Sequence, residues 1–189
     1  MSVSLSLTPP SARFGEIETF ADRVRQALEL SVPVNVEQAV TALGGVIDET
    51  PRSDADYEAS VERTGDGFTI WLDNVPPNRR TFSIAHELGH LFLHLPADPD
   101  ARFMRGANLY VDNATYRMGY GREEAEANAF AGALLMPRDE FRTLFRQAGG
   151  DEQGLASLAR HFGVSRDAAE VRARVLGFRV DRRRKAFSA

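Results

Sequence analysis

The sequence predicts an α+β fold, in which a small antiparallel sheet packs on two helices and a helical subdomain follows. Residues 81–95 form an apolar stretch of helical length, and residues 122–136 form a second helix with acidic residues in its first turn; each is ended by a proline. Residues 57–72 carry β-forming side chains on both sides of a glycine-containing turn at 64–67, which is typical of a hairpin. Beyond residue 137, apolar side chains recur at helical spacing up to the basic tail.

The elements before the hairpin follow from local signals. Residues 17–30 place apolar side chains on one side of an amphipathic helix. Asn35 can cap a second helix over 36–43, which the Gly44-Gly45 pair ends, and a short strand begins at 46–47. We therefore expect two helices to precede the sheet.

Composition limits the possible classes of protein. The 189 residues, 43% of them hydrophobic, suffice for one substantial core with a small appended subdomain. The absence of cysteine excludes a disulfide scaffold and a thiolate zinc site. A net charge of -4 does not favour a dedicated nucleic-acid binder. The first residues lack the features of a signal peptide and no later stretch could span a membrane, so we expect a cytoplasmic protein.

Four segments are expected along the chain. Residues 1–15 should form a flexible arm, because they are rich in serine and proline and bury little. Residues 16–137 should form the core that carries the chemistry. Residues 138–178 should form a helical, helix-turn-helix-like subdomain, and residues 179–189 a basic tail.

The helix at 81–95 carries three ionisable residues, His86, Glu87 and His90, spaced H-E-x-x-H. Residues four apart lie on one helix face, so both imidazoles can reach one ion while Glu87 projects beside it. A lone histidine here would be a hydrogen-bonded core residue, but burying three such groups is costly unless a metal pairs them. We therefore predict zinc at His86 and His90, with Glu87 as the base that deprotonates a water.

His94 extends the histidine series by a further turn. A helix rise of about 12 Å between His86 and His94 is too long for two ligands of one ion. We expect His94 to be a structural residue of the last turn, where an imidazolium suits the helix dipole.

A third ligand should come from the helix at 122–136, where Glu123, Glu124 and Glu126 compete. Glu124 shares its face with small residues that permit close approach of the two helices. Asn128, one turn further on, is placed to hydrogen-bond the metal site. We choose Glu124 as the ligand, keep Glu126 as the alternative, and assign Glu123 to a solvated first turn.

The two motifs, RRTFSIAHELGHLFLH and EEAEANAFAGALLMP, resemble those of the ImmA/IrrE family of bacterial zinc metallopeptidases, and the resemblance runs from about Val24 to Gly177. It implies a gluzincin-like core in which His86, His90 and Glu124 bind zinc. It also implies that Glu87 is the catalytic base. The described substrates of that family are helix-turn-helix transcriptional repressors of phage, mobile-element or DNA-damage genes.

Residues 97–121, between the motifs, form a long predicted loop with Tyr110, Tyr116 and Tyr120. A phenol near zinc could stabilise an oxyanion, but the sequence selects none of the three, and we expect ordinary packing for each. The hairpin edge could hold an extended substrate by strand addition, or the sheet could be scaffold alone.

Two functions from different classes are compatible with these observations. The first, which the resemblance favours, is a zinc endopeptidase that cleaves a partner helix-turn-helix repressor and thereby regulates transcription or a stress response. The second is a zinc-stabilised protein that sequesters a repressor or binds DNA without proteolysis. Residues 155–177 resemble a helix-turn-helix, but they mix acidic and basic side chains, so we expect packing on the core and no direct DNA binding. Glu87 favours the enzyme, because a structural zinc site needs no base.

Overall fold

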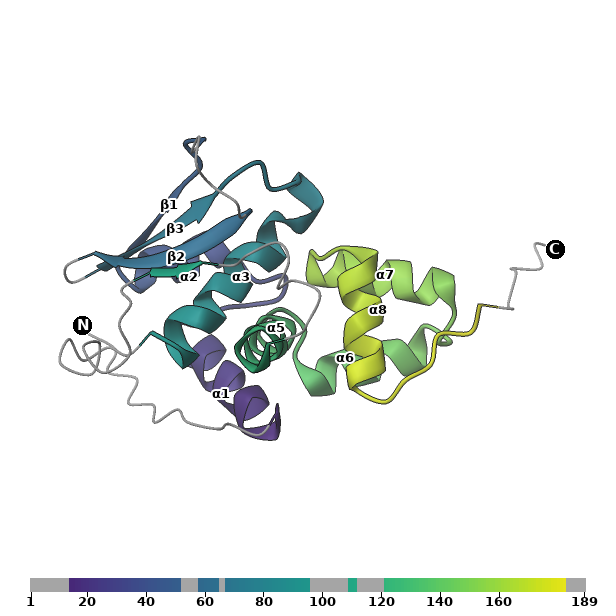
Figure 1. The fold of residues 1–189 in the computed structure, drawn as a ribbon. Helices are drawn as coiled ribbons and strands as arrows, with labels where there is room; N and C mark the ends of the chain where they lie inside the picture. The colour runs from purple at the N-terminus through teal and green to yellow at the C-terminus, as the bar shows by residue number, and fades with distance from the viewer. Residues whose placement is uncertain (1–13, 52–57, 65–66, 96–108, 112–120, 183–189) are drawn as a thin grey trace.

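The computed structural model describes residues 14–51, 58–64, 67–95, 109–111 and 121–182. A sheet lies on one side of the central helix α3, α5 and α1 lie on the other side, and three helices follow beyond α5 (Figure 1). The helices are α1 (Phe14–Ala27), α2 (Val36–Ala42), α3 (Pro77–Leu93), α5 (Arg122–Leu135), α6 (Arg138–Gln147), α7 (Glu152–Phe162) and α8 (Arg166–Val175). The strands are β1 (Gly45–Asp48), β2 (Ala59–Thr64), β3 (Gly67–Leu72) and β4 (Leu109–Val111).

Helix α3 is the centre of the core. Pro77 occupies its first turn, where the missing N–H costs nothing. From Ser83 to Leu91 every side chain is buried, because the sheet covers one side of the helix and α5 the other. The helix ends at His94, whose backbone N–H donates to the carbonyl of His90.

Helix α5 packs against both α3 and α1. It ends before Pro137, since the residue that precedes a proline is disfavoured in a helical conformation. Aromatic rings from the three helices meet in the core: the Phe130 centroid lies 5.7 Å from that of Phe20 and 5.6 Å from that of Phe92. This packing fixes the side of α5 that faces α3.

The sheet has the strand order β1-β3-β2-β4. β2 and β3 form the expected antiparallel hairpin, with Thr64 opposite Gly67. β1 pairs in parallel with β3, so the sheet is mixed rather than wholly antiparallel. β4 pairs with β2 at Ser60–Glu62. Among the described strands, both hairpin strands therefore lie inside the sheet and the edges are β1 and β4. The expectation that an edge of the hairpin holds the substrate is wrong where β4 covers β2, at Ser60–Glu62.

The C-terminal helices have strong local caps. The side chains of Asp151 and Ser165 accept hydrogen bonds from the backbone at the starts of α7 and α8. Gly163 ends α7 at a φ of 65°, a left-handed conformation that glycine adopts without a steric cost. The α+β class with a helical C-terminal region is thus confirmed.

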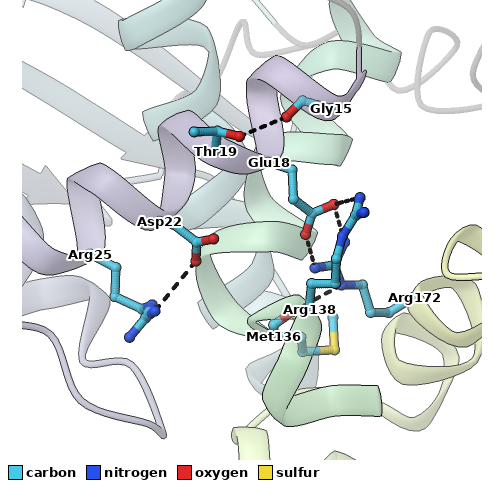
Figure 2. A network of polar contacts seen from close by, with 8 residues as sticks. All are labelled: Gly15, Glu18, Thr19, Asp22, Arg25, Met136, Arg138 and Arg172. Carbon is cyan, nitrogen blue, oxygen red and sulfur yellow. Dashed lines mark hydrogen bonds and ion pairs between the residues drawn. The ribbon is translucent and has the colours of Figure 1, made fainter.

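A buried ion pair joins the first helix to the last (Figure 2). The guanidinium of Arg172 on α8 donates to both carboxylate oxygens of Glu18 on α1, and its Nε donates to the Met136 carbonyl at 2.9 Å. Arg138 also donates to Glu18, at 3.0 Å. These contacts hold α8 against the α1–α5 layer.

Some expectations fall outside the described residues. They concern most of the arm at 1–15, most of the basic tail at 179–189, and Tyr116 and Tyr120. Tyr110 lies on β4, of which the structure describes the backbone. Within the described part of the chain, no helix has the length and apolar character needed to cross a membrane.

Candidate metal centre

Side chains from α3 and α5 converge at one buried point. The Nε2 atoms of His86 and His90 lie 2.9 Å apart. One carboxylate oxygen of Glu124 lies 3.2 Å from the Nε2 of His86, and the other lies 3.3 Å from the Nε2 of His90. The donor atoms of the three residues all lie within 4.8 Å of one another, and all three side chains are buried. This is the spacing of ligands that share one ion.

The structure separates the glutamates that compete as the third ligand. Glu124 is buried against the two histidines, whereas Glu126 lies 3.2 Å from the Nε2 of His94. Glu123 is exposed in the first turn of α5. The group thus consists of His86 and His90 on α3 and Glu124 on α5, whereas Glu126 contacts His94.

Asn128 orients the first histidine. The Nδ1 of His86 lies 3.1 Å from the Oδ1 of Asn128, one turn after Glu124 on α5. An amide oxygen only accepts, so the Nδ1 of His86 carries the proton and donates it. The lone pair of His86 is then on Nε2, which faces His90 and Glu124.

His94 contacts the second histidine, which the sequence analysis did not anticipate. Its Nδ1 lies 2.8 Å from the Nδ1 of His90, on the side of that ring away from Glu124. Burial lowers the pKa of His94 and outweighs the opposite effect of Glu126. This direction favours the neutral imidazole over the imidazolium that the helix dipole would suit.

Burial and neighbouring charges set the protonation of the group. Burial lowers the pKa of His90 to about 3, so its imidazole is neutral near pH 7. Burial would raise the pKa of Glu124, but the imidazoles of His86 and His90 outweigh that effect and hold the pKa below its usual value. Near neutral pH the group therefore offers the neutral imidazole of His90 and the carboxylate of Glu124, the forms in which these side chains bind a metal.

The donor set fits a zinc ion. When the Nδ1 protons of His86 and His90 point away, two Nε2 lone pairs and a carboxylate face one another, and acceptors cannot hydrogen-bond to each other. A cation at their centre removes this conflict. Two histidines and one glutamate leave a position open for water, as in catalytic zinc sites, and the sequence has no cysteine that would close the site as a fourth ligand.

Glu87 lies on α3 directly after His86, and its side chain is completely buried. Burying a carboxylate here costs free energy unless the group is paired or takes part in the chemistry of the site. The H-E-x-x-H spacing therefore lies on a buried helix, which is the structural context that this motif requires.

A groove of about 430 Å³ opens beside His86 and Asn128. Residues from the start of α3, including Phe82, from α5 and from α8 line it. Val171 and Val175 of α8 line it, although they are 53% and 64% exposed. Packing of the C-terminal helices on the core was expected, but their contribution to a groove next to the metal centre was not. The sequence feature that could have indicated this role is the pair of valines four residues apart, Val171 and Val175.

The family model of the IrrE N-terminal-like domain, of the peptidase M78 family, matches residues 53–174, more than half of the chain. The chain belongs to this family. The resemblance to ImmA/IrrE proteins is thereby confirmed, and this family is one of metallopeptidases. The matched range includes the buried His-His-Glu group and most of α8.

No curated protein matches the chain significantly. Among solved structures, the chain is similar to a Mycobacterium tuberculosis transcriptional regulator, with 20% sequence identity and a TM-score of 0.53. The similarity covers 82% of this chain and 45% of that one, so this chain spans less than half the length of the regulator. At this identity the likeness concerns the fold alone.

Proposed function

We propose that this protein is a zinc-dependent endopeptidase that cleaves a helix-turn-helix transcriptional repressor. The observation that carries the proposal is the convergence of His86, His90 and Glu124 at one buried point of a peptidase M78 domain. These three residues would hold the ion. When bound, zinc supplies a Lewis acid that activates water and polarises the peptide carbonyl.

Residues next to the proposed ligands would perform the remaining steps. Glu87 would take a proton from the attacking water and later pass it to the leaving amine. Asn128 keeps the lone pair of His86 on Nε2 through its bond to Nδ1. The buried surroundings of Glu87 exclude bulk water, which strengthens each of these electrostatic interactions.

The groove beside His86 supports an action on peptides. Its lining of Phe82, Met136 and the two valines of α8 suits apolar side chains next to the scissile bond. The start of α3 adds Arg79 and Ser83, which could contact the peptide backbone. Substrate choice would then depend on the C-terminal helix as well as on the metal centre.

A repressor is the substrate because the chain belongs to the family that its motifs resemble, whose described substrates are helix-turn-helix repressors. A folded repressor offers few extended segments, so we expect cleavage at one or very few sites and little action on casein. We further expect the protein to act in the cytoplasm, where such repressors bind DNA.

The test uses helix-turn-helix regulators from the same organism, beginning with any that is encoded near this gene. The zinc-loaded protein and each regulator are incubated with and without a chelator, and fragments are identified by mass spectrometry. The proposal predicts discrete fragments that the chelator prevents and that added zinc restores. An intact regulator in a tight stoichiometric complex would instead support a binding protein that sequesters the repressor without proteolysis.

A further inference from the structure

A line of polar side chains runs from the proposed metal ligand His90 to the surface. Next to His90 lies His94, with 2.8 Å between the two Nδ1 atoms. The Nε2 of His94 lies 3.2 Å from one carboxylate oxygen of Glu126. The Nε of Arg122 donates to the other oxygen at 2.7 Å. The side chain of His94 is only 6% exposed and that of Glu126 12%, whereas Arg122 is 64% exposed.

Hydrogen-bonding rules give this line a direction. The carboxylate of Glu126 can only accept, so the Nε2 of His94 carries a proton and donates it. Where His90 binds an ion through the Nε2 that faces His86 and Glu124, its own proton is on Nδ1, and the Nδ1 of His94 accepts it. The proton between the two Nδ1 atoms consequently belongs to His90, and the lone pair of His90 is on Nε2, 3.3 Å from Glu124.

We propose that His94 and Glu126 are positioning residues that hold His90 in the tautomer and orientation needed for zinc. The proposal rests on the proposed metal centre and extends it. His94 fixes the ring of His90 and makes its Nε2 more basic, while Glu126 fixes the proton on the far side of His94. Asn128 does the same for His86 with a single amide. In the described part of the chain, the two histidines thus have different supports: an amide contacts His86, whereas a histidine and then a carboxylate follow His90.

The alternative is that His94 merely fills the last turn of α3 and neutralises Glu126. In that case its removal would affect folding but not the binding of zinc by the folded protein. Zinc affinity and histidine tautomers therefore separate the two roles, and neither measurement requires enzymatic activity.

The first experiment measures the zinc dissociation constant by competition with a chromogenic chelator, with folding checked by circular dichroism. His94→Phe keeps a ring of similar size but removes the acceptor, and we expect about 10–100-fold weaker zinc binding. His94→Asn keeps an acceptor oxygen close to the position of Nδ1, and should recover most of the affinity. Glu126→Gln should weaken binding less, in the same direction.

Glu123→Gln is the matched control, because it removes the same charge from the same turn of α5 but at an exposed position. It should leave the zinc dissociation constant within about twofold, well short of the loss typical of an outer hydrogen-bonding partner. An equal loss in Glu123→Gln and Glu126→Gln would overturn the role of the hydrogen bond. So would a folded His94→Phe variant with unchanged affinity.

The second experiment reads the tautomers directly by long-range proton–nitrogen NMR of the zinc-loaded protein. The chain has 4 histidines, so single variants suffice to assign every ring. We expect His90 protonated at Nδ1, and His94 protonated at Nε2 with an unprotonated Nδ1. A proton on the Nδ1 of His94 would overturn the proposal even if a His94 variant failed to fold. A wild-type protein that binds no zinc would overturn the proposed function as well, whereas tight zinc binding with the wrong tautomer would overturn this inference alone.

Discussion

Gly89 of α3 lies directly against Ala127 of α5. A Cβ atom at Gly89 would come within 3.0 Å of both the Cα and the carbonyl oxygen of Ala127. Both contacts are with backbone, which cannot move aside without shifting the whole helix. The glycine between Glu87 and His90 therefore sets how closely the helix with Glu124 approaches the helix with the histidines.

We expect Gly89→Ala to push the two helices apart. An alanine in a helix normally gains about 0.5–1 kcal/mol over glycine, but overpacking here should reverse the sign and cost about 1–3 kcal/mol. Zinc affinity should fall as well, because Glu124 would recede from His86 and His90. Urea unfolding and a zinc titration measure the two effects.

Gly132→Ala on α5 is the control for that substitution. The nearest atom to a Cβ at Gly132 is a flexible part of Arg172 at 3.8 Å, an ordinary contact. This variant should keep or slightly gain stability and bind zinc normally. If Gly89→Ala behaves in the same way, close packing of α3 on α5 does not hold the metal centre together.

Zinc content distinguishes the two glutamates of α5 that competed as ligand. Glu124→Ala should lose zinc or bind it more weakly than any loss of an outer hydrogen bond allows, that is by more than about 100-fold. Glu126→Ala should lose much less, since Glu126 contacts His94 and not the point of convergence. Elemental analysis after exhaustive dialysis gives the ranking, and the reverse order would move the third ligand to Glu126.

The sequence predicted that His86, His90 and Glu124 converge, because the determinants of this group are local. Helical spacing places His86 and His90 on one face, and the face of α5 selects Glu124 over Glu126. The pairing of β1 with β3 and of β4 with β2 was not predictable, because strand neighbours depend on distant parts of the chain. The pair Glu18–Arg172 spans 154 residues and has no local signature. The contact between His90 and His94 was missed because His94 was weighed only as a ligand and as a structural residue of the last helix turn. A helix rise that excludes coordination by both His86 and His94 still permits a hydrogen bond between residues one turn apart.

The Glu18–Arg172 pair should contribute to stability above acidic pH. Burial raises the pKa of Glu18, but Arg172 and Arg138 lower it more, so it lies below its usual value of 4.5. Glu18→Gln should lower the free energy of unfolding by about 3 kcal/mol at pH 7. This value is near the lower end for a broken buried ion pair, because solvent still reaches Glu18. The difference in unfolding free energy between the variant and the wild type should be largest above pH 4.5. It should shrink as the pH falls through the lowered pKa of Glu18.

Urea unfolding at several pH values between 3.5 and about 7 tests this pH dependence. Glu16→Gln, exposed two residues earlier on α1, is the control and should change stability by less than about 0.5 kcal/mol. A deficit of Glu18→Gln that stays constant down to the lowest pH would show that lost packing, rather than charge, causes the destabilisation.

The groove beside the metal centre should govern which peptides are cleaved. Val171→Lys places a charge in its apolar lining, and we expect kcat/KM for a peptide spanning the cleaved site to fall about tenfold. Thermal stability and zinc content should not change, because Val171 is 53% exposed. Val46→Lys is the matched control, since Val46 is 58% exposed on β1 and is not among the residues that line the groove. Equal effects of the two lysines would exclude the groove as the peptide-binding site.

Glu87→Gln separates catalysis from metal binding, because it alters the proposed base and none of the three residues that would hold the ion. The variant and the wild type are purified, their zinc content is measured, and both are incubated with the same helix-turn-helix regulators before mass spectrometry. The account predicts near-stoichiometric zinc in both proteins, discrete fragments with the wild type, and at least about 100-fold slower cleavage with the variant. Cleavage by Glu87→Gln at the wild-type rate would contradict it.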